Sequence, residues 1–359
     1  MAEQTELLFR VAEQLPQPMF LARDGRILRC NGACLRQLAG PGEAVEPLLA
    51  EALPEQSAPD TVRTVTIVRG ERQWQATVTP VGEDLLFLMQ PAADPADDLP
   101  DAAAVMRGIL PAADDLQKAG SELFPLLEEQ ENELMQRCTA RIARGYFRIM
   151  RTALHLADFE RMRTGIEPCR ARVDLYEPLR DMLTKAEDAL QDKGILLDWE
   201  VPQGCCHGAV DLDEVLRAVM GLIANAALHA GPSRKISLRL DPSIHRLTFT
   251  VHNDLPMNET AMGHAFGMYS RSWLPDDPEC GMGIGLPVAQ MAARRHGGTV
   301  MLESREGFGT SAVMVIRLDL DANDCNTLKT ELFGGCDPVL TELSAVLGPE
   351  TYDSRNVDI

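Results

Sequence analysis

Two glycine clusters in the last quarter of the chain have the spacing of loops that hold phosphate groups. The first reads Gly281-Met282-Gly283-Ile284-Gly285-Leu286, and the second reads Gly307-Phe308-Gly309-Thr310. Alternating glycines let a backbone approach a polyphosphate with its N–H groups turned inward. A helix predicted from Leu286 to Arg295 would point its positive end at the same place. A single Gly-x-Gly-x-Gly run is a weak signal, because glycine-rich turns are common, so the surrounding elements have to support it.

The elements around these glycines predict an α/β sandwich, with helices on one face of a mixed sheet. Two strands, Thr299–Ser304 and Ser311–Leu318, flank the second cluster and form a hairpin. Upstream, helical periodicity alternates with short strand-like runs. The upstream elements are predicted helices at Tyr176–Gln191 and Asp211–His229 and predicted strands at Ile195–Val201, Lys235–Leu240 and Arg246–Val251.

This arrangement resembles the ATP lid and closing hairpin of sensor histidine kinases, within the wider gyrase/Hsp90/histidine-kinase/MutL ATPase superfamily. The resemblance implies that residues 170–320 are a histidine-kinase-type ATP-binding domain with ATP and Mg²⁺ as cofactors. The nucleotide-binding residues that it implies within the two clusters are Gly281, Gly283, Gly285, Leu286, Gly309 and Thr310.

The same resemblance implies a metal ligand on the helix before the lid. Relatives carry Asn-x-x-x-Asn-Ala-x-Lys there, and an asparagine of this pattern holds Mg²⁺ against the phosphates. This chain has Asn225-Ala226 in register, while Gly221 replaces the first asparagine and Leu228 replaces the lysine. One amide oxygen is enough for a metal ligand where phosphates and waters supply the rest. A buried structural asparagine is the alternative interpretation of Asn225.

The adenine-binding motif of the family, Asp-x-Gly-x-Gly, is altered in this chain. Asn253 stands at the aspartate position, and Leu255 and Met257 replace the two glycines. An asparagine oxygen still accepts a hydrogen bond from an adenine amine, so the resemblance implies Asn253 as a nucleotide-binding residue. With the register shifted by one residue, Asp254 is the alternative to Asn253 at the aspartate position. The ordinary interpretation of Asp254 is a solvated carboxylate in a loop.

Residues 1–90 resemble a PAS sensor domain. A strand ends near Ala22, an Asp24-Gly25 turn follows, and a second strand ends at Asn31, which would cap a helix. Later strands are predicted at residues 62–68, 73–80 and 85–90, where apolar and polar side chains alternate. Any small antiparallel sheet would share these features, and nothing in this segment marks a bound cofactor.

A linker rich in proline, alanine and aspartate, residues 91–100, precedes a predicted helical hairpin over residues 101–165. An apolar stripe on this hairpin can be covered by a second copy of the chain, which makes a four-helix bundle. The hairpin resembles the dimerisation domain of sensor histidine kinases, and a coiled-coil connector is the alternative. The stripe on the second helix comprises Met135, Cys138, Ile142, Tyr146, Ile149, Ala153 and Leu156.

The residue that receives the phosphoryl group in sensor histidine kinases is missing from this hairpin. The family pattern His-Glu-x-x-x-Pro aligns with a segment in which Met106 replaces the histidine and Pro111 keeps the proline. A thioether cannot act as the acceptor. His155 is the first histidine of the chain and lies on the second helix, as the one alternative acceptor. We therefore assign no catalytic residue.

Bulk composition argues against several classes of partner. The 359 residues carry a net charge of −20, whereas nucleic-acid and anionic-membrane surfaces need clustered Lys and Arg. Nine cysteines without Cys-x-x-Cys spacing suit a reducing cytosol, and no apolar run reaches the roughly 18–20 residues that span a bilayer. We expect a cytoplasmic protein. We assign no role to the acidic tail at residues 321–359, in which residues 340–347 can form a short helix.

The predicted fold class is multidomain α+β, and the predicted function is that of a two-component-type signalling protein that resembles a sensor histidine kinase. It would bind ATP and Mg²⁺, form a homodimer through the hairpin, and signal to a response regulator or another signalling protein. Two alternatives stay open: a non-catalytic interaction scaffold with an empty ATPase fold, and an active kinase that uses His155 or a histidine of a partner.

Overall fold

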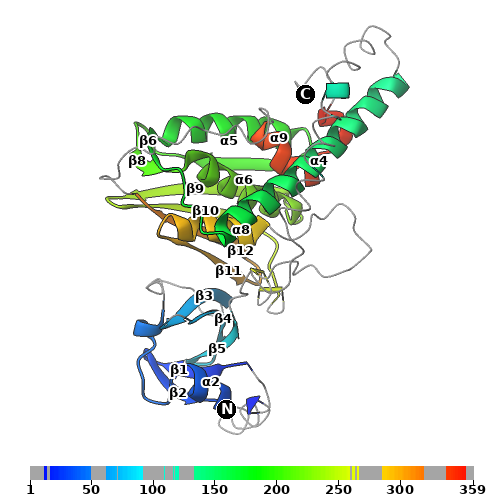
Figure 1. The fold of residues 1–359 in the computed structure, drawn as a ribbon. Helices are drawn as coiled ribbons and strands as arrows, with labels where there is room; N and C mark the ends of the chain where they lie inside the picture. The colour runs from blue at the N-terminus through cyan, green and yellow to red at the C-terminus, as the bar shows by residue number, and fades with distance from the viewer. Residues whose placement is uncertain are drawn as a thin grey trace. The chain divides into compact units, whose positions relative to one another are not determined.

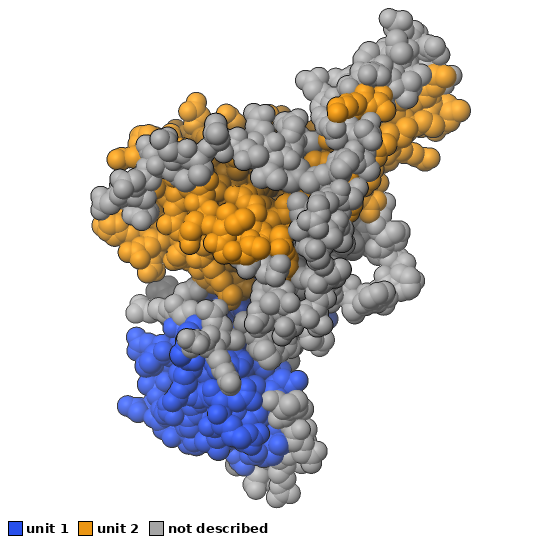
Figure 2. All heavy atoms as spheres, viewed as in Figure 1, with its two compact units in different colours: residues 1–94, 255–270, 301–312 blue, residues 95–254, 271–300, 313–359 orange. Residues whose placement is uncertain are grey.

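The chain folds into two compact units. The structure is a computed structural model that describes residues 12–13, 17–49, 62–70, 72–91, 109, 116, 118–120, 133–258, 261–262, 265–266, 285–318 and 337–352. Unit 1 comprises residues 1–94, 255–270 and 301–312, and unit 2 comprises residues 95–254, 271–300 and 313–359 (Figure 2).

Unit 1 contains an antiparallel sheet with the strand order β2-β1-β5-β4-β3 (Figure 1). Phe20 and Phe87, on neighbouring strands, stack in its core with ring centroids 4.4 Å apart. At the edge of β3, Arg63 and Val62 pair with Glu303 and Ser304 of β11. The elements are β1 (Met19–Arg23), β2 (Arg26–Cys30), α2 (Gly32–Gln37), η1 (Glu46–Leu48), β3 (Val62–Arg69), β4 (Arg72–Val81) and β5 (Asp84–Pro91).

The opening of unit 1 has the local structure that the sequence predicts. Asp24 and Gly25 have positive φ angles of 49° and 71°, as a tight turn between two strands requires. The buried Asn31 caps α2, because its Oδ1 accepts hydrogen bonds from Cys34 N at 2.9 Å and Met19 N at 3.0 Å. The strand, turn and cap predictions are confirmed, and the assignment of a PAS domain stays a prediction.

Unit 2 is built on a mixed sheet with helices packed on one face (Figure 1). In the sheet, β7 and β9 are parallel, β9 and β10 are antiparallel, and β12 and then β11 follow β10. The chain passes between the two units within β11 and β12. The strands are β6 (Ala171–Asp174), β7 (Leu196–Glu200), β8 (His207–Val210), β9 (Lys235–Ser243), β10 (Arg246–Asn253), β11 (Thr299–Arg305) and β12 (Gly309–Arg317).

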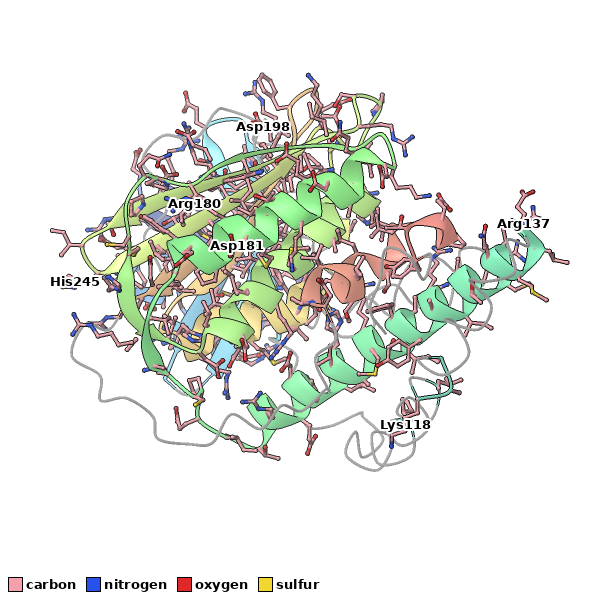
Figure 3. The ribbon with its side chains drawn as sticks, turned by 90° about the horizontal axis from the view of Figure 1, so that it is seen from above. Lys118, Arg137, Arg180, Asp181, Asp198 and His245 are labelled. Carbon is pink, nitrogen blue, oxygen red and sulfur yellow. The ribbon has the colours of Figure 1, made fainter. Side chains whose placement is uncertain are left out.

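Figure 3 looks down on the helical layer of unit 2, where Arg180 and Asp181 mark α5 and Arg137 marks the N-terminal part of α4. Helix α5 has the ends that the sequence predicts, and α6 lies within the predicted range Asp211–His229, whose two end residues cap it. The helices are α4 (Glu133–Arg163), α5 (Tyr176–Gln191), α6 (Leu212–Leu228), α8 (Gly285–Arg295), α9 (Pro338–Glu342), η2 (Leu343–Ala345) and η3 (Pro349–Tyr352).

Two parts of unit 2 differ from the sequence prediction. Strands β6 and β8 form a separate two-stranded antiparallel sheet. Each strand has only four residues, which is too short for the sequence pattern to predict it. Residues 337–352, assigned from the sequence to an acidic tail, form α9, η2 and η3 and pack against α4 and α6. Their burial depends on partners far away in the sequence, which local pattern cannot reveal.

Several predicted features lie outside the described residues. They include most of the linker, most of the first helix of the hairpin with Met106, and the lid glycines Gly281 and Gly283. Among the helices that the structure does describe, none combines the length and the apolar character needed to cross a membrane.

Candidate nucleotide-binding site

Helix α6 begins at a side-chain cap that also ties it to the preceding chain. Asp211 Oδ1 accepts a hydrogen bond from Glu214 N at 3.2 Å, and its Oδ2 accepts one from Cys169 N at 2.9 Å. Aspartate is a preferred N-cap residue, which is why the sequence predicts this start. Val219 and Ile223 of α6 are buried, and the helix packs against β9 and β10, so the later residues of α6 have a fixed position.

A buried ion pair joins α6 to α8. Arg295 Nε lies 2.8 Å from Glu214 Oε1, and both side chains are shielded from solvent. Burial raises the pKa of the Glu214 carboxyl to about 7, although Arg295 opposes the rise. Sequence reasoning missed this pair because the two residues are 81 positions apart.

His296 makes a second connection between the two helices. Its Nδ1 donates a hydrogen bond to the Ala292 carbonyl at 2.8 Å, and its Nε2 accepts one from Asp211 N at 3.0 Å. An imidazole that donates from one nitrogen and accepts at the other is neutral. Burial lowers the pKa of His296, which favours the same neutral form. Together with the ion pair, His296 fixes the orientation of α8.

The first turn of α8 lies against α6. A Cβ placed on Gly221 of α6 would be 3.9 Å from the carbonyl oxygen of Gly285 at the start of α8. Asn225 lies one turn after Gly221 on the same face of α6. Its side chain is half-buried, and its amide has no hydrogen-bond partner among the residues that the structure describes. The start of α8 and the face that carries Asn225 are therefore neighbours.

Among the residues that the structure describes, none fills the space beside Gly285. A Cβ placed there would meet no described atom within 4 Å, and its φ angle is not positive. Neither packing within the described residues nor backbone strain therefore requires glycine at this position. Leu286, the next residue, is 8% exposed and packs into the interior. The absence of a side chain at position 285 leaves room for a ligand at the N-terminus of α8.

Asn253 occupies the end of β10 and is 5% exposed. Its Nδ2 donates a hydrogen bond to the carbonyl oxygen of His229, the C-cap residue of α6, at 2.6 Å. The backbone N–H of His229 in turn donates to the Asn225 carbonyl at 3.2 Å. Because a carbonyl can only accept, the amide of Asn253 is oriented with its Oδ1 directed to other donors.

Asp254, the alternative to Asn253 as the adenine-binding residue, forms a hydrogen bond with the neighbouring loop. Its Oδ2 accepts a hydrogen bond from Ser233 N at 3.2 Å. Hydrogen bonding from Ser233 lowers the pKa of the Asp254 carboxyl. This carboxylate fixes the loop between α6 and β9, which is the ordinary structural role.

The second glycine cluster forms the turn between β11 and β12. Gly307 and Gly309 have φ angles of 77° and 100°. Side chains with a Cβ are disfavoured there, so the turn itself explains both glycines. Their presence does not by itself indicate a ligand.

Within unit 1, the hydroxyl of Thr310 fixes the loop that follows β10. Its Oγ1 donates to the Leu255 carbonyl at 2.8 Å, and Ser304 Oγ accepts from Met257 N at 2.7 Å. The Leu255 side chain points to solvent and is 42% exposed. Sequence reasoning missed Ser304, since a serine in a strand carries no motif of its own.

His155, the alternative acceptor, is buried on α4 with 6% exposure. Its Nε2 lies 3.0 Å from both carboxylate oxygens of Glu342. A phosphoryl acceptor must present a nitrogen to the γ-phosphate, and here this nitrogen already contacts a carboxylate. The geometry counts against an acceptor role for His155.

The predicted site residues are thus distributed over several elements. Within the described ranges, no group of three or more His, Cys, Asp or Glu is arranged to hold a metal ion. Nucleotide and Mg²⁺ binding by the predicted residues stays a prediction. Unit 2 holds Asn225, Asn253, Gly285 and Leu286, unit 1 holds Gly309 and Thr310, and Gly281 and Gly283 lie outside the described residues.

Comparison with known families agrees with this architecture. Residues 210–322 match the family of histidine kinase-, DNA gyrase B-, and HSP90-like ATPases. The chain carries a histidine-kinase-type ATPase domain. The matched range begins just before α6 and ends after β12, so the ATPase domain contains the described parts of the candidate site.

Curated relatives that match part of the chain include sensor histidine kinases. Sensor histidine kinase YvrG of Bacillus subtilis is 29% identical over 114 residues, which is 31% of this chain and 20% of YvrG. Probable sensor histidine kinase TcrY of Mycobacterium tuberculosis is 26% identical over 191 residues, which is 53% of this chain and 39% of TcrY. The matches therefore span well under half the length of these relatives.

Solved structures with partial similarity include a sensor histidine kinase and a full-length protein, ShkA. The mycobacterial sensor histidine kinase MprB has a TM-score of 0.35 and 19% identity, over 42% of this chain and 98% of that chain. Full-length ShkA in complex with AMPPNP has a TM-score of 0.43 and 17% identity, over 60% of this chain and 47% of that chain.

Proposed function

We propose that this protein is a sensor-histidine-kinase-like signalling protein that binds ATP with Mg²⁺ and does not phosphorylate itself in the usual way. The observation that carries the nucleotide part is the space beside Gly285 that the described residues leave open, next to the face of α6 that carries Asn225. Backbone N–H groups at a helix N-terminus attract phosphate. The match of residues 210–322 to the ATPase family supports the same assignment.

Asn225 would provide the protein's ligand to Mg²⁺. Its amide oxygen has the hard-donor character that Mg²⁺ prefers, and Mg²⁺ commonly takes its remaining ligands from phosphates and water. The absence of a described partner for this half-buried amide supports a role outside packing.

Asn253 would select the base. One N–H of its Nδ2 is committed to the His229 carbonyl, which orients the amide so that its Oδ1 acceptor is left for a ligand. The amino group of adenine can donate to that oxygen, whereas guanine presents a carbonyl at the same position, which cannot donate. This arrangement favours ATP over GTP in spite of the change from aspartate to asparagine.

The output would be conformational. No histidine precedes His155 in the chain, and His155 contacts Glu342 in the interior. Nucleotide occupancy, or a signal at the PAS-like residues 1–90, would then shift the protein between arrangements that a response regulator or another cytoplasmic signalling protein reads.

Titration of the full chain with Mg-ATP tests the nucleotide assignment. We expect saturable binding heat with Mg-ATP, and binding weaker by at least about tenfold with Mg-GTP. Asn225→Ala should lose at least about tenfold in Mg-ATP affinity, because the metal loses its protein ligand. Asn225→Asp is the matched control, since a carboxylate retains a hard oxygen ligand and should keep Mg-dependent binding.

The same titration separates the alternatives. A wild-type chain without binding heat would reject nucleotide binding and favour the empty scaffold. Equal affinities of wild type and Asn225→Ala would remove the metal role of Asn225 while leaving nucleotide binding in place. The active-kinase alternative is tested with ATP labelled in its γ-phosphate. Acid-labile label on the wild-type chain that is absent from His155→Ala would support that alternative.

A homodimer through α4 is also part of this proposal. Ile142 and Ile149 lie two turns apart on one face of the helix and are 49% and 39% exposed. Light scattering of the full chain should give the mass of a dimer, and Ile142→Glu combined with Ile149→Glu should give a monomer, since charges in an apolar seam oppose packing.

The control for the dimer is Ile244→Glu. Ile244 is 81% exposed in the turn between β9 and β10, away from α4, so this variant should keep the wild-type mass. A monomeric wild type, or a dimer that survives both substitutions on α4, would remove α4 as the dimer seam.

A further inference from the structure

The C-terminal residues 337–352 pack against the helical layer of unit 2. In Figure 3, α9, in the reddish colour of the C-terminus, lies between α4 and α5, and it contacts α4, α5 and α6. Asp337 caps α9, since its Oδ1 accepts from Val339 N at 2.8 Å. Four large side chains of the segment are buried at no more than 2% exposure: Val339, Leu343, Leu347 and Tyr352.

At the centre of this contact lies a buried carboxylate. Glu342 is 1% exposed, and its oxygens lie 3.0 Å from His155 Nε2 and 3.4 Å from Arg151 Nε. Burial disfavours the charged carboxylate, yet His155, Arg151 and Arg217 together hold the pKa of Glu342 below its usual range. The two partners in direct contact, His155 and Arg151, both belong to α4.

Further contacts follow along the same face of α4. The ring of Phe147 lies 5.2 Å, centroid to centroid, from that of Tyr352. Arg144 Nε donates to the Ser344 carbonyl at 3.4 Å. Positions 144, 147, 151 and 155 are spaced by three and four residues, so they form one continuous stripe on the helix.

The C-terminal part of α4 is held by different groups. Asp158 accepts two hydrogen bonds from Arg217 of α6, at 2.8 Å and 3.0 Å. Helix α4 also contacts α8. The helix is therefore attached to the layer at two places, by Arg217 of α6 at Asp158 and by residues 337–352 between Arg144 and His155.

We propose that residues 337–352 are a C-terminal clasp that holds the middle of α4 against the other helices of unit 2, so that this part of α4 moves with α5 and α6 while the clasp is closed and separately from them once it opens. Glu342 is the residue that closes the clasp, because its removal leaves His155 and Arg151 buried without their carboxylate. The clasp contacts the face of α4 opposite Ile142 and Ile149. It therefore determines which face of α4 is exposed.

Hydrogen–deuterium exchange of the full chain, read peptide by peptide, tests the clasp. In Glu342→Gln, amides of residues 144–155 should exchange at least about tenfold faster than in the wild type. Residues 156–163, β9 and β10 should keep their wild-type rates, because Arg217 of α6 still binds Asp158 in that part of α4. Glu350→Gln is the matched control, since Glu350 lies in the same segment with a 67% exposed side chain paired to Lys193, and it should leave every rate unchanged.

Two results would overturn the clasp. One is an unchanged rate for residues 144–155 in Glu342→Gln, and the other is an equal acceleration in β9 and β10, which indicates global unfolding. Where Glu342→Gln does not fold, Tyr352→Leu replaces it. This variant removes the ring contact with Phe147 and the hydrogen bond to the Leu340 carbonyl without changing charge. It should give the same regional pattern, and its failure to accelerate residues 144–155 would equally reject the clasp.

Discussion

Gly285→Ala should lower Mg-ATP affinity by at least about tenfold and leave the protein as stable as the wild type or slightly more stable. The methyl group would enter the space beside the first turn of α8, where a phosphate would approach the backbone N–H groups. The fold should tolerate it, because no described atom lies within 4 Å of that Cβ and the φ angle is not positive. Alanine in a helix is favoured over glycine by up to about 1 kcal/mol.

Two measurements on the same sample decide this prediction. Calorimetric titration gives the affinity, and denaturant unfolding gives the free energy of unfolding. Loss of binding with retained stability supports a ligand beside Gly285. Unchanged affinity would place the phosphates elsewhere, and a large loss of stability would give Gly285 a packing role.

Gly298→Ala should destabilise the fold by about 3 kcal/mol or more, whereas Gly285→Ala should leave the stability unchanged or slightly higher. A Cβ at this position would lie 1.9 Å from the carbonyl oxygen of Val315 and 3.0 Å from the Cα of Ile316. Both atoms belong to the backbone of β12, which cannot move aside as a flexible side chain can. The turn after α8 would therefore have to separate from the sheet.

Gly285→Ala is the matched control, because both substitutions add one methyl group at a glycine beside α8. Denaturant unfolding monitored by circular dichroism should show a lower midpoint for Gly298→Ala alone. Equal midpoints for wild type and Gly298→Ala would mean that the turn relaxes easily. The close approach to Val315 would then not require glycine at position 298.

The fold of unit 2 was largely predictable from the sequence, and particular residues explain why. Asp211 signals the start of α6, and the long periodic run from Tyr176 to Gln191 defines α5. Strands β6 and β8 could not be found, since four residues each give too few positions for an alternation to stand out.

The candidate site was predictable only in part. Motif spacing identifies Asn225 and Gly285, but it does not reveal that Thr310 bonds the Leu255 carbonyl or that Asn253 bonds the His229 carbonyl. Backbone carbonyls are the same for every residue type, so sequence carries no sign of such bonds. Likewise, Glu342 reads as one more acidic tail residue until α4 brings His155 to it across 187 positions.

The attachment of α4 makes the helix a lever. Its 31 residues span about 46 Å, and the stretch from Glu133 to Arg144, which precedes the first clasp contact, spans about 16 Å. Figure 1 shows this end of α4 extending beyond the other helices of unit 2. With the pivot at Arg144, a tilt of about 10° would move the Glu133 end by about 3 Å. Small rearrangements around Glu342 would therefore become ångström-scale displacements at the end that joins the preceding part of the chain.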